Sequence, residues 1–422
     1  MERALYISPV LPRRYGRGVE QRAYRLIEAL SHRYRVSLLT TARAEPGGPA
    51  ASDARAICDD VTILPLGRWT AGALAQRALR RFLPAQYYAW YRQPSDWRML
   101  SRADQRRLMD THVRGRFDLV HVHRLYMLPL LVCSPILAQV PACMDLDDVE
   151  SITRDRLAAL ARLNGERKLA YTMQQDAWAY RAIERRELAR FERVFVCSDA
   201  DRDRLLASVG SRSVDVLPNV VEIPEAQSRR MPRASGRPFV FLFVGALDYY
   251  PNRDGAVFLC RDIAPLIRHR VSGPFEIRIV AEGSRAHRRP VPDIPEVSWA
   301  PPDADLAREY GAADAAIVPI RAGGGTRIKT LEAFAYRTAV VSTAIGVEGL
   351  EVEHGQHALI GETAADLAAH AAAVMDDAAL RSRLTEHAFT LVRTAYSPAV
   401  LRQRLDAVHG DAPRAADPAG IQ

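Results

Sequence analysis

Three consecutive glycines, Gly323 to Gly325, separate an apolar run over 315–320 from a predicted helix that includes the helix-forming residues 331–335. Thr326 follows the glycines as a candidate N-cap of that helix. A glycine turn exposes backbone N–H groups, and the dipole of the following helix adds partial positive charge at the same point. A strand, a glycine turn and a helix in this order therefore predict an anion-binding site, although a plain flexible loop has the same composition.

Charged residues follow this turn at helical spacing. Arg327 and Lys329 should lie in the first helical turn, where the helix dipole disfavours positive charge. Glu332 follows Lys329 by about one turn. Two cations in an unfavourable place indicate a negatively charged ligand; the alternative is that both are solvated surface charges.

A second candidate site is the acidic run from Asp145 to Glu150, which holds four carboxylates within six residues. Clustered carboxylates repel one another unless cations or a function accompany them. Asp145 and Asp148 could orient a hydroxyl group or accept its proton. The alternatives are that Asp148 caps a helix beginning near Arg154, or that the run binds a metal.

Strand-like and helix-like segments alternate along the chain, which predicts an α/β fold. Near the N-terminus, strands over 4–8 and 36–40 flank a helix over 20–32. This order is typical of doubly wound parallel sheets, whose ligands bind beyond the carboxyl ends of the strands. Candidate site residues at two such ends are Gly16, Arg17, Gly18 and His123. A two-glycine loop can also be ordinary turn chemistry, and a strand histidine is more often a core residue.

The chain of 422 residues is long enough for two domains. We expect the first over 1–222 and the second over 239–395, joined by a linker over 223–238 that is rich in charges and turn formers. A last helix is predicted over 396–409, and the tail over 410–422 should be disordered.

The run from Gly323 to Leu350 closely resembles the donor-nucleotide segment of family-four glycosyltransferases, which are retaining enzymes of the GT-B fold. Phe117 to His123, Asp145 to Ser151 and Phe239 to Asn252 resemble other segments of that family. The resemblance implies two doubly wound, Rossmann-like domains that face each other across a cleft. It also implies that the last helix crosses back to the first domain, and that no metal is needed.

The resemblance implies roles for individual residues. A glutamate at the position of Glu332 holds the ribose hydroxyls in that family, and nearby basic residues hold the diphosphate. A glycine loop after the first strand faces the acceptor and the phosphates. The implied donor-binding residues are Gly245, Arg253, Gly324, Gly325, Thr326, Arg327, Lys329 and Glu332; the acceptor-side residues are Gly16, Arg17 and Gly18; and the catalytic candidates are Asp148, Asp145 and His123.

One departure from the family pattern concerns sugar selectivity. The usual signature is a pair of glutamates separated by seven residues, and the position of the first is occupied here by Gly324. A branch of the family shares the glycine-rich turn followed by Thr-Arg-x-Lys, so the replacement need not abolish activity.

The net charge of +8 is distributed unevenly. Cations and aromatics interleave over 68–116, which favours contact with an anionic membrane surface or a lipid-linked acceptor. An acidic polymer could also bind there, and so could nucleic acid, which we do not favour. The structural alternative is a helix that packs its aromatics inward and leaves its arginines in water. The five cysteines show no C-x-x-C pair, so no disulfide framework or zinc site is indicated.

The opening residues are too poor in apolar residues for a signal peptide, and no run approaches a membrane span, so a cytoplasmic protein is expected, with peripheral contact at the inner membrane face as an option. We expect a glycosyltransferase that moves a sugar from a nucleotide diphosphate sugar to an acceptor hydroxyl, with no cofactor. The alternatives are a sugar-nucleotide epimerase of the same fold and a non-catalytic nucleotide-binding partner subunit.

Overall fold

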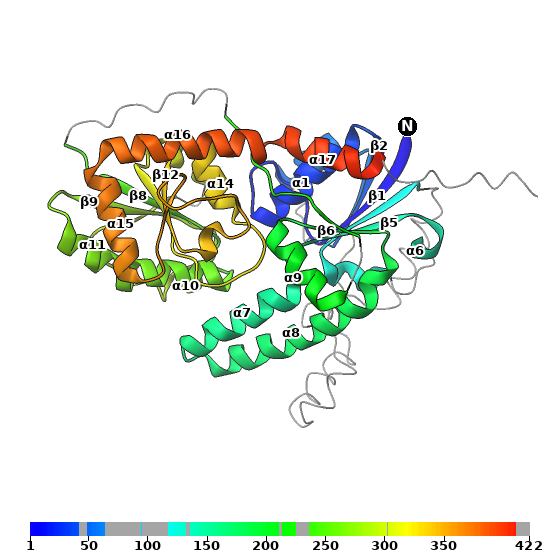
Figure 1. Ribbon diagram of the computed structural model, residues 1–422, viewed down its shortest axis with the longest axis horizontal. Coiled ribbons are helices and arrows are strands. Elements are labelled where there is room, and N and C mark those ends of the chain that lie inside the picture. The colour runs from blue at the N-terminus through cyan, green and yellow to red at the C-terminus, as the bar shows by residue number, and fades with distance from the viewer. Residues whose placement is uncertain are drawn as a thin grey trace, which may run out of the picture.

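The computed structural model describes residues 1–41, 49–63, 94, 117–131, 136–210, 213–224, 236–301 and 303–410. The basic aromatic segment over 68–116, apart from Pro94, and most of the expected linker and tail lie outside the described residues. The described strands form two parallel sheets with helices on their faces (Figure 1). This arrangement confirms the predicted α/β class with two doubly wound sheets.

The N-terminal sheet has seven strands in the order β3-β2-β1-β4-β5-β6-β7. Its strands are β1 (Glu2–Ser8), β2 (Tyr34–Thr40), β3 (Asp60–Ile63), β4 (Leu119–His123), β5 (Ala142–Asp147), β6 (Arg193–Val196) and β7 (Val214–Val216). The α-helices of this domain are α1 (Gly18–Ser31), α2 (Pro49–Ile57), α6 (Ile136–Gln139), α7 (Glu150–Leu163), α8 (Arg167–Glu187) and α9 (Asp199–Val209). Short 3₁₀ helices occur at Leu125–Leu130 and Leu188–Arg190.

The C-terminal sheet has six strands in the order β10-β9-β8-β11-β12-β13. Its strands are β8 (Phe239–Val244), β9 (Phe275–Val280), β10 (Val297–Trp299), β11 (Ala315–Val318), β12 (Ala339–Ser342) and β13 (Leu359–Ile360). The α-helices that follow β8 are α10 (Tyr250–Phe258), α11 (Ala264–Arg270), α12 (Arg285–Arg288), α13 (Leu306–Ala312), α14 (Ile328–Ala335), α15 (Ala364–Asp376), α16 (Ala378–Ala395) and α17 (Pro398–Gly410). A π-helical turn joins α10 to α11 at Leu259–Ile263, and a 3₁₀ turn covers Ile345–Val347.

The central strands are apolar on both faces because helices cover both sides of each sheet. In β8, Phe239, Phe241 and Phe243 pack into one buried cluster, while Leu242 packs into the cluster on the opposite side. Helix α17 lies against the N-terminal domain, where Leu401 and Leu405 join the cluster around α1 (Figure 1). Among the described residues, no helix combines the length and hydrophobicity needed to cross a bilayer.

Both sheets reverse their strand order at one point, between β1 and β4 in the first and between β8 and β11 in the second. The chain leaves the two strands on opposite faces there, and in doubly wound sheets ligands bind at such points, beyond the carboxyl ends of the strands. Four loops begin at these points, namely the loops that follow β1, β4, β8 and β11. These loops, or their first residues, hold most of the candidate site residues: those of the glycine turn, of the Gly16 loop and of the Gly245 loop, and His123 at the end of its strand.

Candidate active site

The glycine turn after β11 packs directly on the N-terminal domain. Gly323 and Gly325 have positive φ angles of 130° and 61°, a conformation that favours glycine. A Cβ atom at Gly324 would overlap the hydroxyl of Thr153, and one at Gly325 would overlap the carboxylate of Asp148. Glycine is therefore required here by the close approach of two domains as well as by the turn itself.

The predicted N-cap role of Thr326 is wrong. Helix α14 begins at Ile328 with Arg327 at the N-cap position, and no side chain caps it. The hydroxyl of Thr326 instead accepts a hydrogen bond at 2.9 Å from the side-chain amide of Asn219 in the N-terminal domain. The helix begins one residue later than a cap at Thr326 would place it, so Arg327 precedes its first turn and Lys329 lies within it.

Lys329 is the cation whose environment is most strongly perturbed at this turn. Its Nζ donates to Asn252 Oδ1 at 2.7 Å and lies 5.3 Å from the centre of the Phe243 ring. Burial, together with the positive charge of Arg327, lowers the pKa of Lys329 to about 7. The ammonium therefore lacks an anionic partner strong enough to hold its charge, and a bound diphosphate would supply one.

Arg327 lies beside Lys329. One of its terminal nitrogens, Nη1, donates to the carbonyls of Gly324 and Gly325. The other, Nη2, is buried and has no hydrogen-bond partner among the described residues. An unpaired guanidinium nitrogen next to a partly neutral lysine forms a ready site for phosphate oxygens.

Glu332 lies between the two domains. Its carboxylate accepts from Gln21 Nε2 of α1 at 2.8 Å and from the Tyr310 hydroxyl at 3.3 Å, and burial raises its pKa. The loops after β1, β8 and β9 meet nearby: Arg17 forms ion pairs at 2.9 Å with Asp248, after β8, and with Glu282, after β9.

The remaining glycines and Arg253 line the same region. A Cβ at Gly245 would lie 2.8 Å from Asn252 Cγ and 3.0 Å from Lys329 Nζ, so this position also holds backbone close to the lysine. The carbonyl of Gly16 accepts from Gln21, and a Cβ at Gly18 would lie 3.4 Å from Ile328. Arg253 donates to the carbonyl of Leu247 at 3.4 Å and packs over Tyr250.

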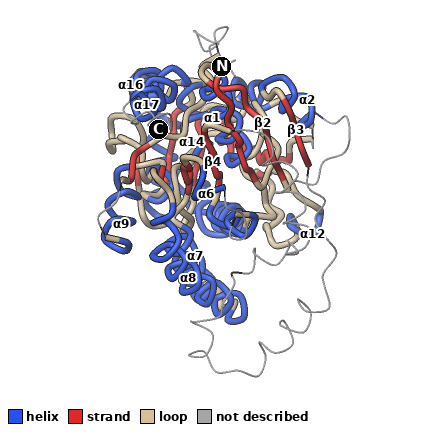
Figure 2. The backbone as a smooth tube through the Cα atoms, turned by 90° about the vertical axis from the view of Figure 1, so that its right-hand side faces the viewer, coloured by secondary structure: helices blue, strands red, loops and turns tan. Residues whose placement is uncertain are grey.

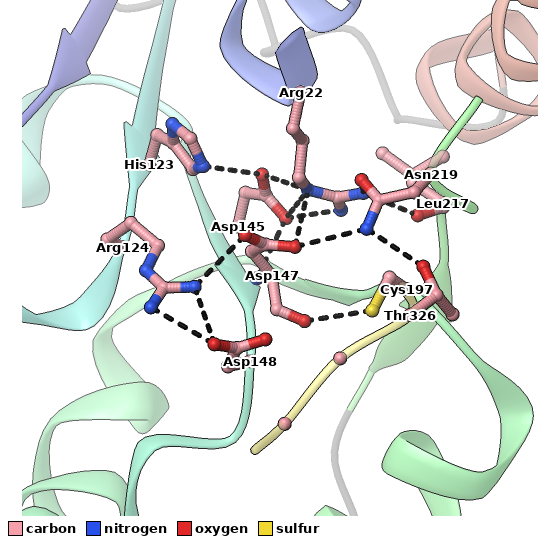
Figure 3. A network of polar contacts seen from close by, with 12 residues as sticks. Arg22, His123, Arg124, Asp145, Asp147, Asp148, Cys197, Leu217, Asn219 and Thr326 are labelled. Atoms are coloured by element: carbon pink, nitrogen blue, oxygen red, sulfur yellow. Dashed lines mark hydrogen bonds and ion pairs between the residues drawn. The ribbon is translucent and has the colours of Figure 1, made fainter. Parts of the chain in front are cut away.

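Asp145 is completely buried beneath this surface and is held by Arg22 of α1 (Figure 3). The guanidinium donates to both oxygens of the carboxylate, at distances from 2.6 to 3.2 Å. Burial alone would raise the pKa of Asp145, but Arg22 lowers it to about 2. These contacts favour a role for Asp145 in fixing Arg22, which also donates to Asn219 and to the carbonyl of Leu217.

Asp148 lies nearer the glycine turn, within 3.1 Å of Arg124 (Figure 3). The capping alternative is not supported, because α7 begins at Glu150 with Val149 as its N-cap and no side-chain cap. The neighbouring Asp147 has a positive φ of 57°, and burial with the charge of Asp148 raises its pKa to about 6. Of the predicted catalytic residues, Asp148 is the one that directly faces the glycine turn.

His123 is also completely buried, and its Nε2 lies 3.8 Å from Asp145. Burial lowers its pKa to about 3, so the imidazole is neutral near pH 7. Neither ring nitrogen has a hydrogen-bond partner among the described residues. His123 thus lies in β4 beside Asp145, its register partner in β5 (Figure 3).

Several residues of this region were missed by sequence reasoning, namely Gln21, Arg22, Arg124, Asn219, Asn252 and Tyr310. A signal was available for Arg124, which directly follows the strand end at His123 and has a positive φ of 76°. The others approach from distant segments. The part of the chain that the structure describes contains no group of three or more histidine, cysteine, aspartate or glutamate side chains suited to a metal ion.

Two protein-family models match the chain. Residues 17–220 match the family described as glycosyl transferase 4-like domain, and residues 238–377 match the family described as glycosyl transferases group 1. Together the two matches cover most of the chain, which belongs to the glycosyltransferases. No curated protein sequence shows significant similarity to this glycosyltransferase.

Solved structures similar to this glycosyltransferase confirm its GT-B fold. Sucrose-phosphate synthase from Thermosynechococcus elongatus has a TM-score of 0.67 at 17% identity, covering 97% of this chain and 98% of its own. Anabaena HepE in complex with UDP-glucose has a TM-score of 0.66 at 13% identity, covering 98% and 100%. WaaG, a glycosyltransferase involved in lipopolysaccharide biosynthesis, has a TM-score of 0.61 at 13% identity, covering 96% and 100%.

Proposed function

We propose that this glycosyltransferase moves a hexose from a nucleotide diphosphate sugar to an acceptor hydroxyl with retention of configuration and without a metal. The observation that carries the proposal is the electrostatics of the turn after β11. A lysine whose pKa is lowered to about 7 lies beside a buried, unpaired arginine nitrogen. Such a pair gains most from a ligand that carries several negative charges close together, as a diphosphate does.

Departure of the diphosphate is the chemical step that this turn can assist. Negative charge develops on the leaving phosphate oxygens, and Lys329, Arg327 and the start of α14 can stabilise it. Because these donors are already in place, they need no reorganisation during the reaction. The charge neutralisation that a metal supplies in other enzymes would come here from the protein.

The acceptor hydroxyl must reach the sugar from the N-terminal side of the cleft. Asp148 faces Gly325 across the domain boundary and is held by Arg124. It is therefore the carboxylate best placed to orient the hydroxyl or take up its proton. Asp145 would act indirectly, by fixing Arg22 and through it the position of α1.

Glu332 is the proposed ligand of the ribose hydroxyls. Its present partner, Gln21, belongs to the other domain, so nucleotide binding would replace this interdomain hydrogen bond. HepE, a protein of the same fold, has been solved with UDP and with UDP-glucose. UDP is accordingly the first nucleotide to test. The pathways we consider are polysaccharide, glycolipid and glycosylated-metabolite synthesis in the cytoplasm.

The decisive experiment is calorimetric titration of the protein with UDP, GDP, ADP and dTDP. We expect one of them to bind with micromolar affinity, and Glu332→Ala to weaken it by roughly 1–3 kcal/mol, the value of a hydrogen bond to a charged group. Glu362→Ala, an exposed carboxylate of the same domain, is the matched control and should bind as the wild type does.

Binding of none of the four nucleotides, or equal affinity for Glu332→Ala, would contradict the donor-site assignment. Turnover of a nucleotide sugar to its epimer without acceptor would favour the epimerase alternative. Nucleotide binding without turnover of any donor would favour a non-catalytic partner subunit.

A further inference from the structure

Helices α7 and α8 form a hairpin that projects from the body of the molecule (Figures 1 and 2). Helix α7 faces the C-terminal domain: Leu157 and Leu160 pack with Ala322, and Arg156 donates to the carbonyl of Gly323 at 3.0 Å. Helix α8 packs along α7, and its buried residues include Ala177, Tyr180 and Ile183. The opposite side of α8 faces away from α7.

That side of α8 carries two large exposed aromatics. Tyr171 is 55% exposed and Trp178 is 43% exposed. They are seven residues apart, so they share one side of the helix. Arg167 lies four residues before Tyr171 and Arg185 lies seven after Trp178, which places all four on one stripe. We call Arg167, Tyr171, Trp178 and Arg185 the α8 stripe; it is about 27 Å long at 1.5 Å per residue.

Further cations and an aliphatic side chain flank the α8 stripe. Lys168 and Arg186 are exposed beside it, and Leu163, the last residue of α7, is 71% exposed. Arg167 and Lys168 lie in the first turn of α8, where the helix dipole disfavours positive charge. Neither side chain has an ion pair or hydrogen bond among the described residues. Their placement is unfavourable for the isolated helix.

The carboxylates of the hairpin do not neutralise the α8 stripe. Asp176 and Glu184 are buried on the inner side of α8, and Glu187 pairs with Arg186 and Arg190. Asp155 of α7 pairs with Arg181. Glu166, before the first turn, interacts with Tyr250 of the C-terminal domain. The stripe is thus positively charged at both ends and aromatic in the middle.

We propose that the α8 stripe docks on an anionic lipid surface. Tryptophan and tyrosine place an apolar ring and a polar edge at the boundary between headgroups and acyl chains, and arginine reaches the phosphates. Each cation near such a surface adds to the attraction. Leu163 favours lipid over an acidic polysaccharide, because an aliphatic side chain gains by leaving water only where the partner is apolar.

A second copy of the chain fits this surface poorly. In a parallel pairing of two α8 helices, Arg167 would face Arg167 and Arg185 would face Arg185. In an antiparallel pairing, Arg167 would face Arg185. Like charges would meet at both ends in either case, which disfavours a dimer through this stripe. The proposal concerns where the enzyme is held and does not depend on the identity of its donor.

The test is co-sedimentation with vesicles of phosphatidylcholine alone and of phosphatidylcholine with phosphatidylglycerol, at low and physiological salt. The wild type should bind only the anionic vesicles, more weakly at higher salt. Tyr171→Ala/Trp178→Ala and Arg167→Glu/Lys168→Glu should each weaken binding at least tenfold. The charge reversal should preserve folding, since acidic residues suit a helix N-terminus.

The matched control is Arg383→Glu/Arg393→Glu, which reverses two exposed charges on α16, far from the hairpin in Figure 1. This control should bind vesicles within twofold of the wild type, and every variant should keep the nucleotide affinity of the wild type. If the wild type bound no nucleotide, the proposed function would be overturned, but the vesicle result could still be interpreted. No wild-type binding to anionic vesicles, or equal binding by the stripe variants, would overturn the proposal. So would a dimer that the stripe variants abolish, or equally strong binding to an acidic polysaccharide.

Discussion

Lys329 illustrates how a single residue can be costly for folding and useful for binding. It is partly buried beside Arg327, and its pKa is lowered to about 7. In the unfolded chain the ammonium would keep its ordinary, higher pKa. Between these two pKa values the folded state binds fewer protons than the unfolded state. The cost in stability is therefore greatest below pH 7 and lessens as the pH rises toward the ordinary lysine pKa.

Replacing Lys329 by methionine should separate the two effects. Lys329→Met should raise Tm by about 2 °C or more, because a partly buried cation is exchanged for an apolar chain of similar length. The same change should weaken nucleotide diphosphate binding at least tenfold. Differential scanning calorimetry and isothermal titration measure the two outcomes, and a lower Tm would contradict this account of Lys329.

The wild type should also take up a proton when the nucleotide binds above pH 7, because a bound diphosphate stabilises the ammonium. Affinity should then fall between pH 7 and 9, by up to about tenfold per pH unit. Titrations in buffers of different ionisation enthalpy measure the proton, and Lys329→Met should abolish the uptake.

Asp145 and Asp148 are close in sequence but differ in their surroundings. Asp145 is fully buried and paired with Arg22, and its pKa is lowered to about 2. Asp145→Asn should cost about 3–5 kcal/mol at pH 7, because it leaves the buried guanidinium of Arg22 with only the more distant Asp147, at 3.7 Å, as a counter-charge. The wild-type contribution is fully present above the ordinary carboxyl pKa and is lost as pH falls toward 2.

Asp148→Asn is the contrasting variant. It should change the free energy of unfolding by less than about 1 kcal/mol and lower turnover on the order of 100-fold or more, the usual size of a general acid–base effect. Urea unfolding and initial rates with the identified donor measure these quantities. If Asp145→Asn proved neutral for stability while Asp148→Asn unfolded the protein, the division of roles would be wrong.

At the scale of elements, the site depends on strand ends brought together by sheet topology. The glycine turn joins β11 to α14 and presses on the loop that joins β5 to α7, with Gly325 opposite Asp148. A side chain at this point would hold the two loops apart. The turn therefore sets how closely the domains can approach as well as where the anion binds.

Gly325→Ala tests this contact. The added Cβ would overlap the Asp148 carboxylate, and alanine would have to adopt the positive φ of 61° that glycine has here. Gly355→Ala is the matched control, because Gly355 has a positive φ of 77° with nothing within 4 Å of a Cβ. Both variants should lose similar stability from backbone strain, about 1 kcal/mol. Only Gly325→Ala should lower kcat, at least tenfold, and equal rates for the two would refute the close-approach argument.

At the scale of the whole molecule, α7 ties the two domains together. Arg156 pairs with Glu348 through both terminal nitrogens and also donates to the carbonyl of Gly323. Arg204 of α9 pairs with the same glutamate. Both arginines belong to the N-terminal domain, and both contact loops that surround the proposed donor site. These contacts join the two domains beside the proposed donor site.

Arg156→Met should shift the domains toward an open arrangement. We expect a larger radius of gyration in small-angle X-ray scattering and a KM for donor raised several-fold, because closure would no longer be stabilised by this ion pair. Arg278→Met is the control, since Arg278 pairs with Glu309 within the C-terminal domain. An unchanged scattering profile with Arg156→Met would show that closure does not rest on this contact.

The sequence was most informative where local pattern governs structure. Alternating apolar strands and helices predicted two doubly wound sheets, because a strand covered on both faces must be apolar throughout, as Phe239 to Val244 shows. The glycines at 323–325 predicted a tight turn at a strand end for the same local reason. Local pattern failed at Thr326, because its hydroxyl is used by Asn219, which lies 107 residues earlier in the chain.

The sequence by itself determined the fold class and the family, since periodicity and short motifs record which backbone each segment adopts. Only the tertiary structure decided which charges meet. Arg22 neutralises Asp145, Arg124 faces Asp148, and Gln21 reaches Glu332 across the domain boundary. Each of these pairs joins segments far apart in sequence, and the strength of an electrostatic contact depends on distance and burial in space, which spacing along the chain does not record.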